Sequence, residues 1–294
     1  MYDIAGIYQA QSVFDAVCAL RDDPEAVLIC GGTDVLIQVR AGKLAGRRLV
    51  SIHGLPALCG VFSEPDDTLR IGPATTFFDL SAHPVIRQRV PMLGQAADQV
   101  GSPQIRRMGT IGGNIANAAT SADTAPSLFA YQAVLELTGP DGVRQVSIAD
   151  FYTGPGKSVR AHDEVLTAIR ILPADFTGFF GCYLKYGKRN AMEISTLGCA
   201  ALVRLDGAGR VEDLRLAFGV AAPTPIRCGA AEALARGNVP DEALYDALAD
   251  AVRQNITPRS SWRASADFRL QIAGELTRRA VRDAVRQAKE GAAC

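Results

Sequence analysis

The chain has 294 residues, of which 48% are apolar and 21% charged, and its formal net charge is zero. These values are typical of a soluble globular protein with two or three subdomains. They argue against a nucleic-acid partner or an anionic membrane surface, since both favour a strong basic excess. We also expect no membrane span and a cytoplasmic location, because no apolar stretch is long enough and "MYDIAGIYQAQS" carries no signal-peptide pattern.

The first fifty residues predict a small βαβ-like unit with a glycine turn at the end of a strand. Residues 12–20 place their apolar side chains on one helical face, with Ser12 as the N-cap. A short apolar strand at 26–30 then runs directly into "GGTD". A helix that ends near Gly42 and a strand at 48–52 follow.

Further along, the pattern predicts an α+β chain whose best candidate boundary is 173–178. The predicted elements are a strand at 68–76, helices at 77–83, 91–100 and 125–133, a hairpin at 134–151, strands at 180–186, 197–206 and 211–221, and helices near 241–254 and 264–289. The order of the last five predicts a C-terminal antiparallel three-stranded sheet with helices, distinct from the first part.

Cysteine and histidine usage indicates no metal site. The chain has seven cysteines: Cys18, Cys30, Cys59, Cys182, Cys199, Cys228 and Cys294. No two lie within four residues of each other, so a structural zinc site or an iron–sulfur cluster carried by this chain is not expected. Their apolar neighbours favour buried, reduced thiols. The three histidines are widely separated and are interpreted as surface or structural residues: His53, His83 and His162.

Two glycine pairs are the strongest local signal, "ICGGTD" at 29–34 and "TIGGN" at 110–114. Glycine lets a ligand approach the backbone closely, and successive N–H groups in such a loop can bind an anion. Nearby hydroxyls and amides add donors and acceptors for a phosphate-bearing cofactor. The alternative is that both pairs are ordinary tight turns. Neither pair matches the dinucleotide or P-loop fingerprints.

The sequence shows no obvious catalytic acid, base or nucleophile beside these glycines. A protein of this kind leaves the reaction to its cofactor and supplies position and electrostatics. Flavin is the natural candidate, because hydride and electron transfer need no protein nucleophile.

The chain resembles the FAD-binding subunits of the molybdenum hydroxylases, the family of xanthine dehydrogenase and of the medium subunit of carbon monoxide dehydrogenase. The resemblance covers nearly the whole chain in family order, in the segments "LICGGTDVLIQVRAGK", "RRMGTIGGNIANAATSADTAPSL", "FYTGPGKS", "DEVLTAIRI", "YLKYGKRNAMEISTLGCAA", "LAFGVAAPTPIR" and "PRSSWRASADFR". The last two favour the bacterial xanthine dehydrogenase branch. The FAD subunit of a different heterocycle, aldehyde or CO dehydrogenase stays open as an alternative.

The resemblance implies a two-part FAD-binding domain of the vanillyl-alcohol oxidase and CO dehydrogenase flavoprotein type at 1–174, with subdomains at about 1–55 and 56–174. A CO dehydrogenase flavoprotein-like C-terminal domain is then expected at 178–290.

The resemblance also implies which residues hold FAD, with no catalytic side chain and no metal on this chain. The implied residues are Leu28, Ile29, Cys30, Gly31, Gly32, Thr33, Asp34, Val35, Thr110, Ile111, Gly112, Gly113, Asn114, Asn117, Asp123, Leu166 and Lys185. The first segment is expected at the pyrophosphate and adenosine, and the second at the phosphates and ribityl chain. Asp123 would fix the adenine–ribose end or the loop itself, Leu166 would contact the adenine, and Lys185 would face the flavin.

One position departs from the family pattern. In eukaryotic relatives an aromatic stacks on the isoalloxazine about ten residues before the threonine of the second segment. Here that position falls on or near Val100, so Tyr186 or another aromatic would have to take that place.

The function implied by the resemblance is electron transfer. A large molybdopterin subunit would oxidise the substrate, and a small subunit with [2Fe–2S] clusters would carry electrons to FAD, which passes them to NAD+ or another acceptor. Two alternatives from other classes are a stand-alone flavin oxidase and a non-enzymatic assembly subunit in which the glycine turns are structural.

Overall fold

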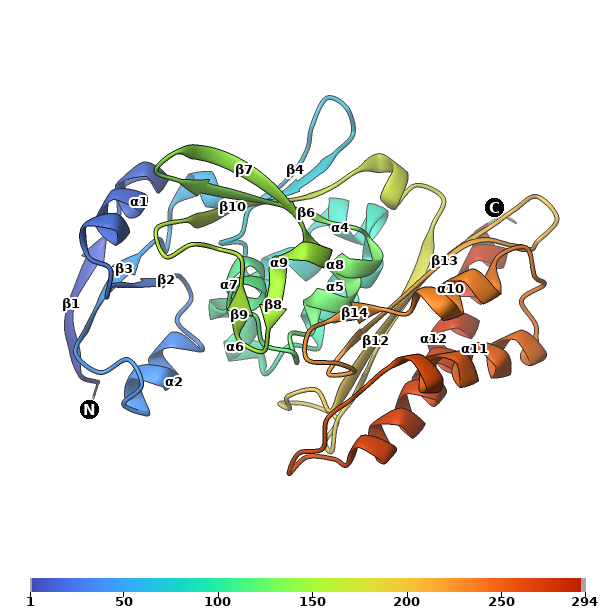
Figure 1. The fold of residues 1–294 in the computed structure, drawn as a ribbon. Helices are drawn as coiled ribbons and strands as arrows, with labels where there is room; N and C mark the ends of the chain where they lie inside the picture. The colour runs from blue at the N-terminus through green and yellow to red at the C-terminus, as the bar shows by residue number, and fades with distance from the viewer. Residues whose placement is uncertain (1, 292–294) are drawn as a thin grey trace.

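The computed structural model describes residues 2–291, and its N-terminal part is a small parallel sheet of order β1-β3-β2 (Figure 1, blue). Its elements are β1 (Ile4–Gln9), α1 (Val13–Asp22), β2 (Val27–Ile29), α2 (Val35–Arg40) and β3 (Arg47–Ser51). Helix α1 begins where the sequence predicts, because the Ser12 hydroxyl accepts a hydrogen bond from the Asp15 N–H at 3.0 Å. Strand β1 was not among the predicted elements.

The middle of the chain forms an antiparallel sheet of order β4-β5-β10-β6-β7, covered by short helices. The strands are β4 (Val61–Ser63), β5 (Leu69–Ile71), β6 (Val134–Gly139), β7 (Gly142–Ser147) and β10 (Val165–Ile171), with a separate pair β8 (Tyr152–Gly154) and β9 (Lys157–Ser158). The helices are α3 (Phe77–Ala82), α4 (Pro84–Arg89), α5 (Pro91–Asp98), α6 (Pro103–Met108), α7 (Ile111–Ala116), α8 (Thr124–Ala130) and α9 (Ile148–Phe151), with 3-10 turns at Pro56–Leu58 and Pro173–Asp175. The predicted strand at 68–76 is therefore shorter, and the chain leaves the sheet at Gly72 and Pro73.

The C-terminal part is a second antiparallel sheet, of order β11-β12-β13-β14. Its elements are β11 (Phe180–Tyr186), β12 (Leu197–Leu205), β13 (Val211–Gly219), β14 (Ile226–Arg227), α10 (Gly229–Ala235), α11 (Glu242–Asn255) and α12 (Ala266–Gly291). The prediction of three strands missed β14, which has two residues and so carries too little pattern to be recognised.

Helices cover both faces of this second sheet, α5 and α8 on one side and α10 and α12 on the other, with α11 packed on α10 and α12 (Figure 1). Leu202 of β12 packs into the core shared with the middle of the chain, and its neighbours Ala201 and Val203 pack into the core that contains α12. A strand buried on both faces needs apolar residues at successive positions. This explains why "LGCAALV" is continuously apolar rather than alternating.

The architecture is α+β, as expected, with the C-terminal antiparallel sheet in place. Within residues 2–291, every helix is too short or too polar to cross a membrane. The cysteines in the described part of the chain are free thiols, and Cys294 lies outside it. The same residues contain no cluster of His, Cys, Asp and Glu that could hold a metal ion.

Candidate functional site

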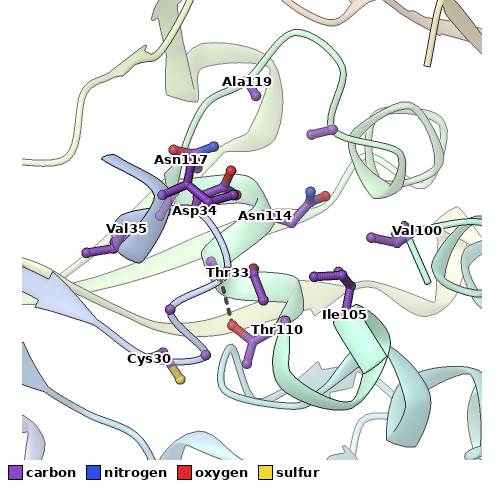
Figure 2. A pocket seen from close by; sticks show the side chains of 18 of the residues that line it. Cys30, Thr33, Asp34, Val35, Val100, Ile105, Thr110, Asn114, Asn117 and Ala119 are labelled. Atoms are coloured by element: carbon purple, nitrogen blue, oxygen red, sulfur yellow. Dashed lines mark hydrogen bonds between the residues drawn. The ribbon is translucent and has the colours of Figure 1, made fainter. Parts of the chain in front are cut away.

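A cavity of about 830 Å³ lies where the three sheets approach one another, and both glycine segments line it (Figure 2). Most of the residues implied by the sequence are in its wall: Leu28, Cys30, Gly31, Gly32, Thr33, Asp34, Val35, Thr110, Gly112, Gly113, Asn114, Asn117, Asp123 and Leu166. Ile29, Ile111 and Lys185 are not in the wall. Segments about eighty residues apart in the sequence are thus brought to one site.

The first glycine segment is docked against the second by Gly31. A Cβ atom at this position would lie 1.7 Å from the carbonyl oxygen of Met108 and 3.3 Å from the Cα of Gly109. The absence of a side chain therefore lets two backbones meet. Gly32 follows with a φ of 71°, a left-handed conformation that favours glycine and turns the chain toward α2.

The second glycine segment is a short helix, so its prediction as a loop was wrong. Residues Ile111–Ala116 form α7, whose N-cap Thr110 accepts a hydrogen bond from the Gly113 N–H at 3.1 Å. The Gly112 N–H donates to the carbonyl of Pro73 at 2.8 Å, and a Cβ on Gly112 would lie 2.3 Å from the Pro73 Cβ. This contact with the preceding strand end overrides the low helix propensity of the glycine pair.

Several polar groups along the cavity have no hydrogen-bond partner among residues 2–291. They include the backbone N–H groups of Gly32, Thr33 and Asp34, the Thr33 hydroxyl and the Asn117 side-chain amide. Asn114 is fixed through its Oδ1, which accepts from the Thr124 hydroxyl at 2.7 Å. Free N–H, hydroxyl and amide groups are suited to phosphate oxygens and to the hydroxyls of a sugar-like chain.

Asp123 lies at the edge of the cavity and is held by the C-terminal domain. One carboxylate oxygen accepts from the Tyr183 hydroxyl at 2.9 Å and the Ser195 hydroxyl at 2.5 Å. The other pairs with the Lys185 ammonium at 2.8 Å, and Lys185 also donates to the Gln99 carbonyl. Burial raises the pKa of the Asp123 carboxyl, and the Lys185 ammonium opposes that rise. In this structure Lys185 is therefore the partner of Asp123 rather than a cation that lines the cavity.

Charged side chains enter the cavity from loops whose residues were not among the implied FAD-binding residues. Arg160 and Arg263 form no ion pair with any carboxylate in the described part of the chain, whereas Arg189 pairs with Glu193 at 3.7 Å. Burial lowers the pKa of Arg160, which donates to the carbonyl of Glu164 at 2.6 Å. The cavity therefore offers two arginines for an anionic ligand, one near β10 and one on the C-terminal domain.

Burial also raises the pKa of Asp34, which carries a carboxyl into the same wall. His162 lines the cavity too, but its Nε2 lies 3.1 Å from the Leu20 carbonyl and 3.2 Å from that of Asp23, a structural role. Both side chains stand on the N-terminal side of the cavity.

The residues that sequence reasoning missed lie mainly in two loops of the C-terminal domain. The missed lining residues include Ile105, Arg160, Arg189, Met192, Glu193, Ile194, Trp262 and Arg263. Val100 does line the cavity, as an aliphatic side chain. Tyr186 does not, because its ring packs edge-on against Phe268 with centroids 5.7 Å apart.

Comparison with known proteins gives two family matches along the chain. Residues 2–174 match the FAD binding domain in molybdopterin dehydrogenase, and residues 182–284 match the CO dehydrogenase flavoprotein C-terminal domain. The putative xanthine dehydrogenase FAD-binding subunit of Escherichia coli K12 is 46% identical over 285 residues, which is 97% of each chain. The carbon monoxide dehydrogenase medium chain of Hydrogenophaga pseudoflava is 32% identical, over 92% of this chain and 93% of that one.

Solved structures agree with these matches. A carbon monoxide dehydrogenase structure from Hydrogenophaga pseudoflava superposes with a TM-score of 0.90 at 31% identity, covering 96% of this chain and 97% of that one. Quinoline 2-oxidoreductase from Pseudomonas putida 86 gives a TM-score of 0.90 at 26% identity, with the same coverage.

Proposed function

Because this chain belongs to the FAD-binding subunits of the molybdenum hydroxylase family, and is thus an oxidoreductase subunit, we propose that it passes electrons from a partner's iron–sulfur clusters to NAD+ or another acceptor. The donor would be a small subunit with [2Fe–2S] clusters, fed by a large molybdopterin subunit that oxidises the substrate. The identity to the Escherichia coli subunit favours a xanthine dehydrogenase-like complex.

The observation that carries this proposal is the donor set of the cavity. The free N–H groups of residues 32–34 and the free side chains of Thr33 and Asn117 fit the pyrophosphate and ribityl hydroxyls of FAD. Arg160 adds a positive charge that forms no ion pair within the described residues, although the carboxylates of Asp163 and Glu164 lie near enough to act on it. Leu28 and Leu166 provide an apolar surface for the adenine at the N-terminal end.

Bound FAD would supply the electron-transfer chemistry, and the protein groups would bind, orient and shield it. Gly31 and Gly112 fix the two wall segments against each other and against Pro73, so the donors are in place before the ligand arrives. Asp123 joins this wall to the C-terminal domain through Lys185. We likewise propose that the functional division of the chain is a FAD-binding part at 1–174 and a C-terminal domain at 178–290.

The test combines Thr33→Val with Asn117→Ala in the full chain. Both side chains lack partners within residues 2–291, so we expect unchanged stability and a Kd for FAD about tenfold higher or more, measured by equilibrium dialysis. Thr153→Val, on the exposed surface of β8, is the matched control. Protein purified from the intact complex without FAD would contradict the whole proposal.

The acceptor is tested separately, by adding NADH to the FAD-loaded chain without air. Loss of the oxidised flavin absorbance is expected if NAD+ is the acceptor. FAD-loaded protein that NADH does not reduce would point to another acceptor. A stand-alone oxidase would instead reduce its flavin with a small alcohol, and an assembly subunit would retain no flavin.

A further inference from the structure

Trp262 is the only tryptophan of the chain, and it is the most exposed large apolar side chain of the described residues, at 79%. It also lines the cavity. The other aromatic side chain in the cavity wall, Phe77, is buried and packs against Gly109. Trp262 is thus the aromatic in the wall that has a large surface free for a ligand.

Hydrogen bonds hold the turn that carries Trp262 in place. It stands at the tip of a turn in which the Ser261 N–H donates to the Ala264 carbonyl at 2.9 Å. Arg269 of α12, only 2% exposed, donates to the Ser261 hydroxyl at 2.8 Å and to the Arg259 carbonyl. A buried guanidinium needs hydrogen-bond partners. Arg269 finds these two in the loop that carries Trp262, and thereby holds that loop against α12.

Two cations lie over the indole ring, and the 79% exposure of Trp262 leaves much of its surface free for a ligand. The Arg263 guanidinium carbon is 4.4 Å and the Lys188 ammonium 5.5 Å from the ring centroid, both within cation–π range. Lys188 comes from the loop between β11 and β12, so the tip meets a second loop of the same domain. An aromatic face flanked by positive charge is complementary to a planar heteroaromatic ring that gains negative charge on reduction.

We propose that Trp262 packs on the isoalloxazine ring of FAD and supplies the aromatic wall that Val100 does not. This inference rests on the proposed function. Leu166 of β10 is only 4% exposed, whereas Trp262 is 79% exposed, so an electron acceptor from solvent would meet the cavity near Trp262. The reactive ring of the cofactor therefore belongs at the Trp262 end.

The test compares Trp262→Ala and Trp262→Phe with the wild-type full chain. For Trp262→Ala we expect a Kd for FAD about twofold to tenfold higher, together with brighter emission from bound flavin, because contact with indole quenches flavin fluorescence. Trp262→Phe keeps a ring for packing but not the quencher. It should therefore retain the affinity to within about twofold while the bound flavin still brightens.

Phe14→Ala is the matched control, since Phe14 is 72% exposed on α1 and does not line the cavity. It should change neither the Kd for FAD nor the emission of the bound flavin. If wild-type protein binds FAD and Trp262→Ala matches it in affinity and emission, the inference is wrong while the proposed function stands. Wild-type protein that takes up no FAD would overturn both.

Discussion

The two walls of the cavity are built in opposite ways. The N-terminal wall, formed by lining residues within 28–35 and 109–117, presents backbone N–H groups, short side chains and the single carboxyl of Asp34, and packing from behind fixes it. The C-terminal wall, residues 189–194 and 262–263, presents long charged and aromatic side chains at the tips of loops. The first wall is suited to bind the phosphates and the sugar-like chain of a ligand. The second wall is suited to contact the reactive ring of that ligand.

The largest expected effect concerns the joint between the walls. Asp123→Ala leaves the Lys185 ammonium buried, with 9% of its side chain exposed, and without its charged partner. We expect a loss of about 3–5 kcal/mol in the free energy of unfolding, measured by urea denaturation. Adding Lys185→Met to this variant should restore part of the loss, because the unpaired charge is removed. If Asp123→Ala is as stable as the wild type, the ion pair between Asp123 and Lys185 does not join the two walls.

A second experiment separates packing from ligand binding within the N-terminal wall, using two adjacent glycines. Gly112→Ala would place a Cβ 2.3 Å from Pro73, and we expect a loss of about 1–3 kcal/mol in stability. Gly113→Ala meets only the Thr110 hydroxyl at 3.0 Å, so stability should stay within about 0.5 kcal/mol of the wild type. Thermal unfolding of the FAD-free chain measures both. Equal losses would contradict a wall fixed by packing at Gly112.

The smallest effect lies outside both walls, where Arg144 of β7 forms a two-point ion pair with Glu164 at 2.6 and 2.8 Å. These hydrogen bonds lower the pKa of Glu164. The Glu164 carboxylate therefore contributes to the free energy of unfolding above its unfolded pKa of about 4.3. That contribution is lost as the pH falls through the pKa of the folded state. Because 45% of the Arg144 side chain is exposed, we expect the ion pair to contribute only about 0.5–1 kcal/mol to the free energy of unfolding.

Urea denaturation of wild type and Arg144→Met at a series of pH values measures this contribution. The two stability curves should differ at neutral pH and converge in acid. A constant difference across the range would assign the effect of Arg144 to its packing instead of its charge.

The two walls also differ in how far the sequence reveals them. Gly31, Gly32, Thr33 and their counterparts near Thr110 stand together in short segments, so composition alone points to a ligand. It did not reveal that Gly31 and Gly112 face protein backbone, since that depends on contacts with Met108 and Pro73.

Both loops of the C-terminal wall lie in segments that carry the family resemblance, but nothing in their composition assigned their residues to the cavity. Trp262 and Arg189 lie more than seventy residues apart and reach the cavity only after β11, β12 and α12 have packed. Lys185 illustrates the same limit, because its pairing with Asp123 depends on how the two parts of the chain dock. Elements with long periodic patterns, such as α11 and α12, were predictable, whereas β1 and the two-residue β14 were not.

The sheet of the C-terminal domain, covered by helices from both halves of the chain, has a consequence for biosynthesis. Helices α5 and α8 leave the ribosome before β11, β12 and β13, so the apolar face that packs on this sheet stays uncovered until those strands are made. A truncated first half would expose this face and aggregate. The two parts of the chain therefore complete one shared apolar core, and neither buries its share of it alone.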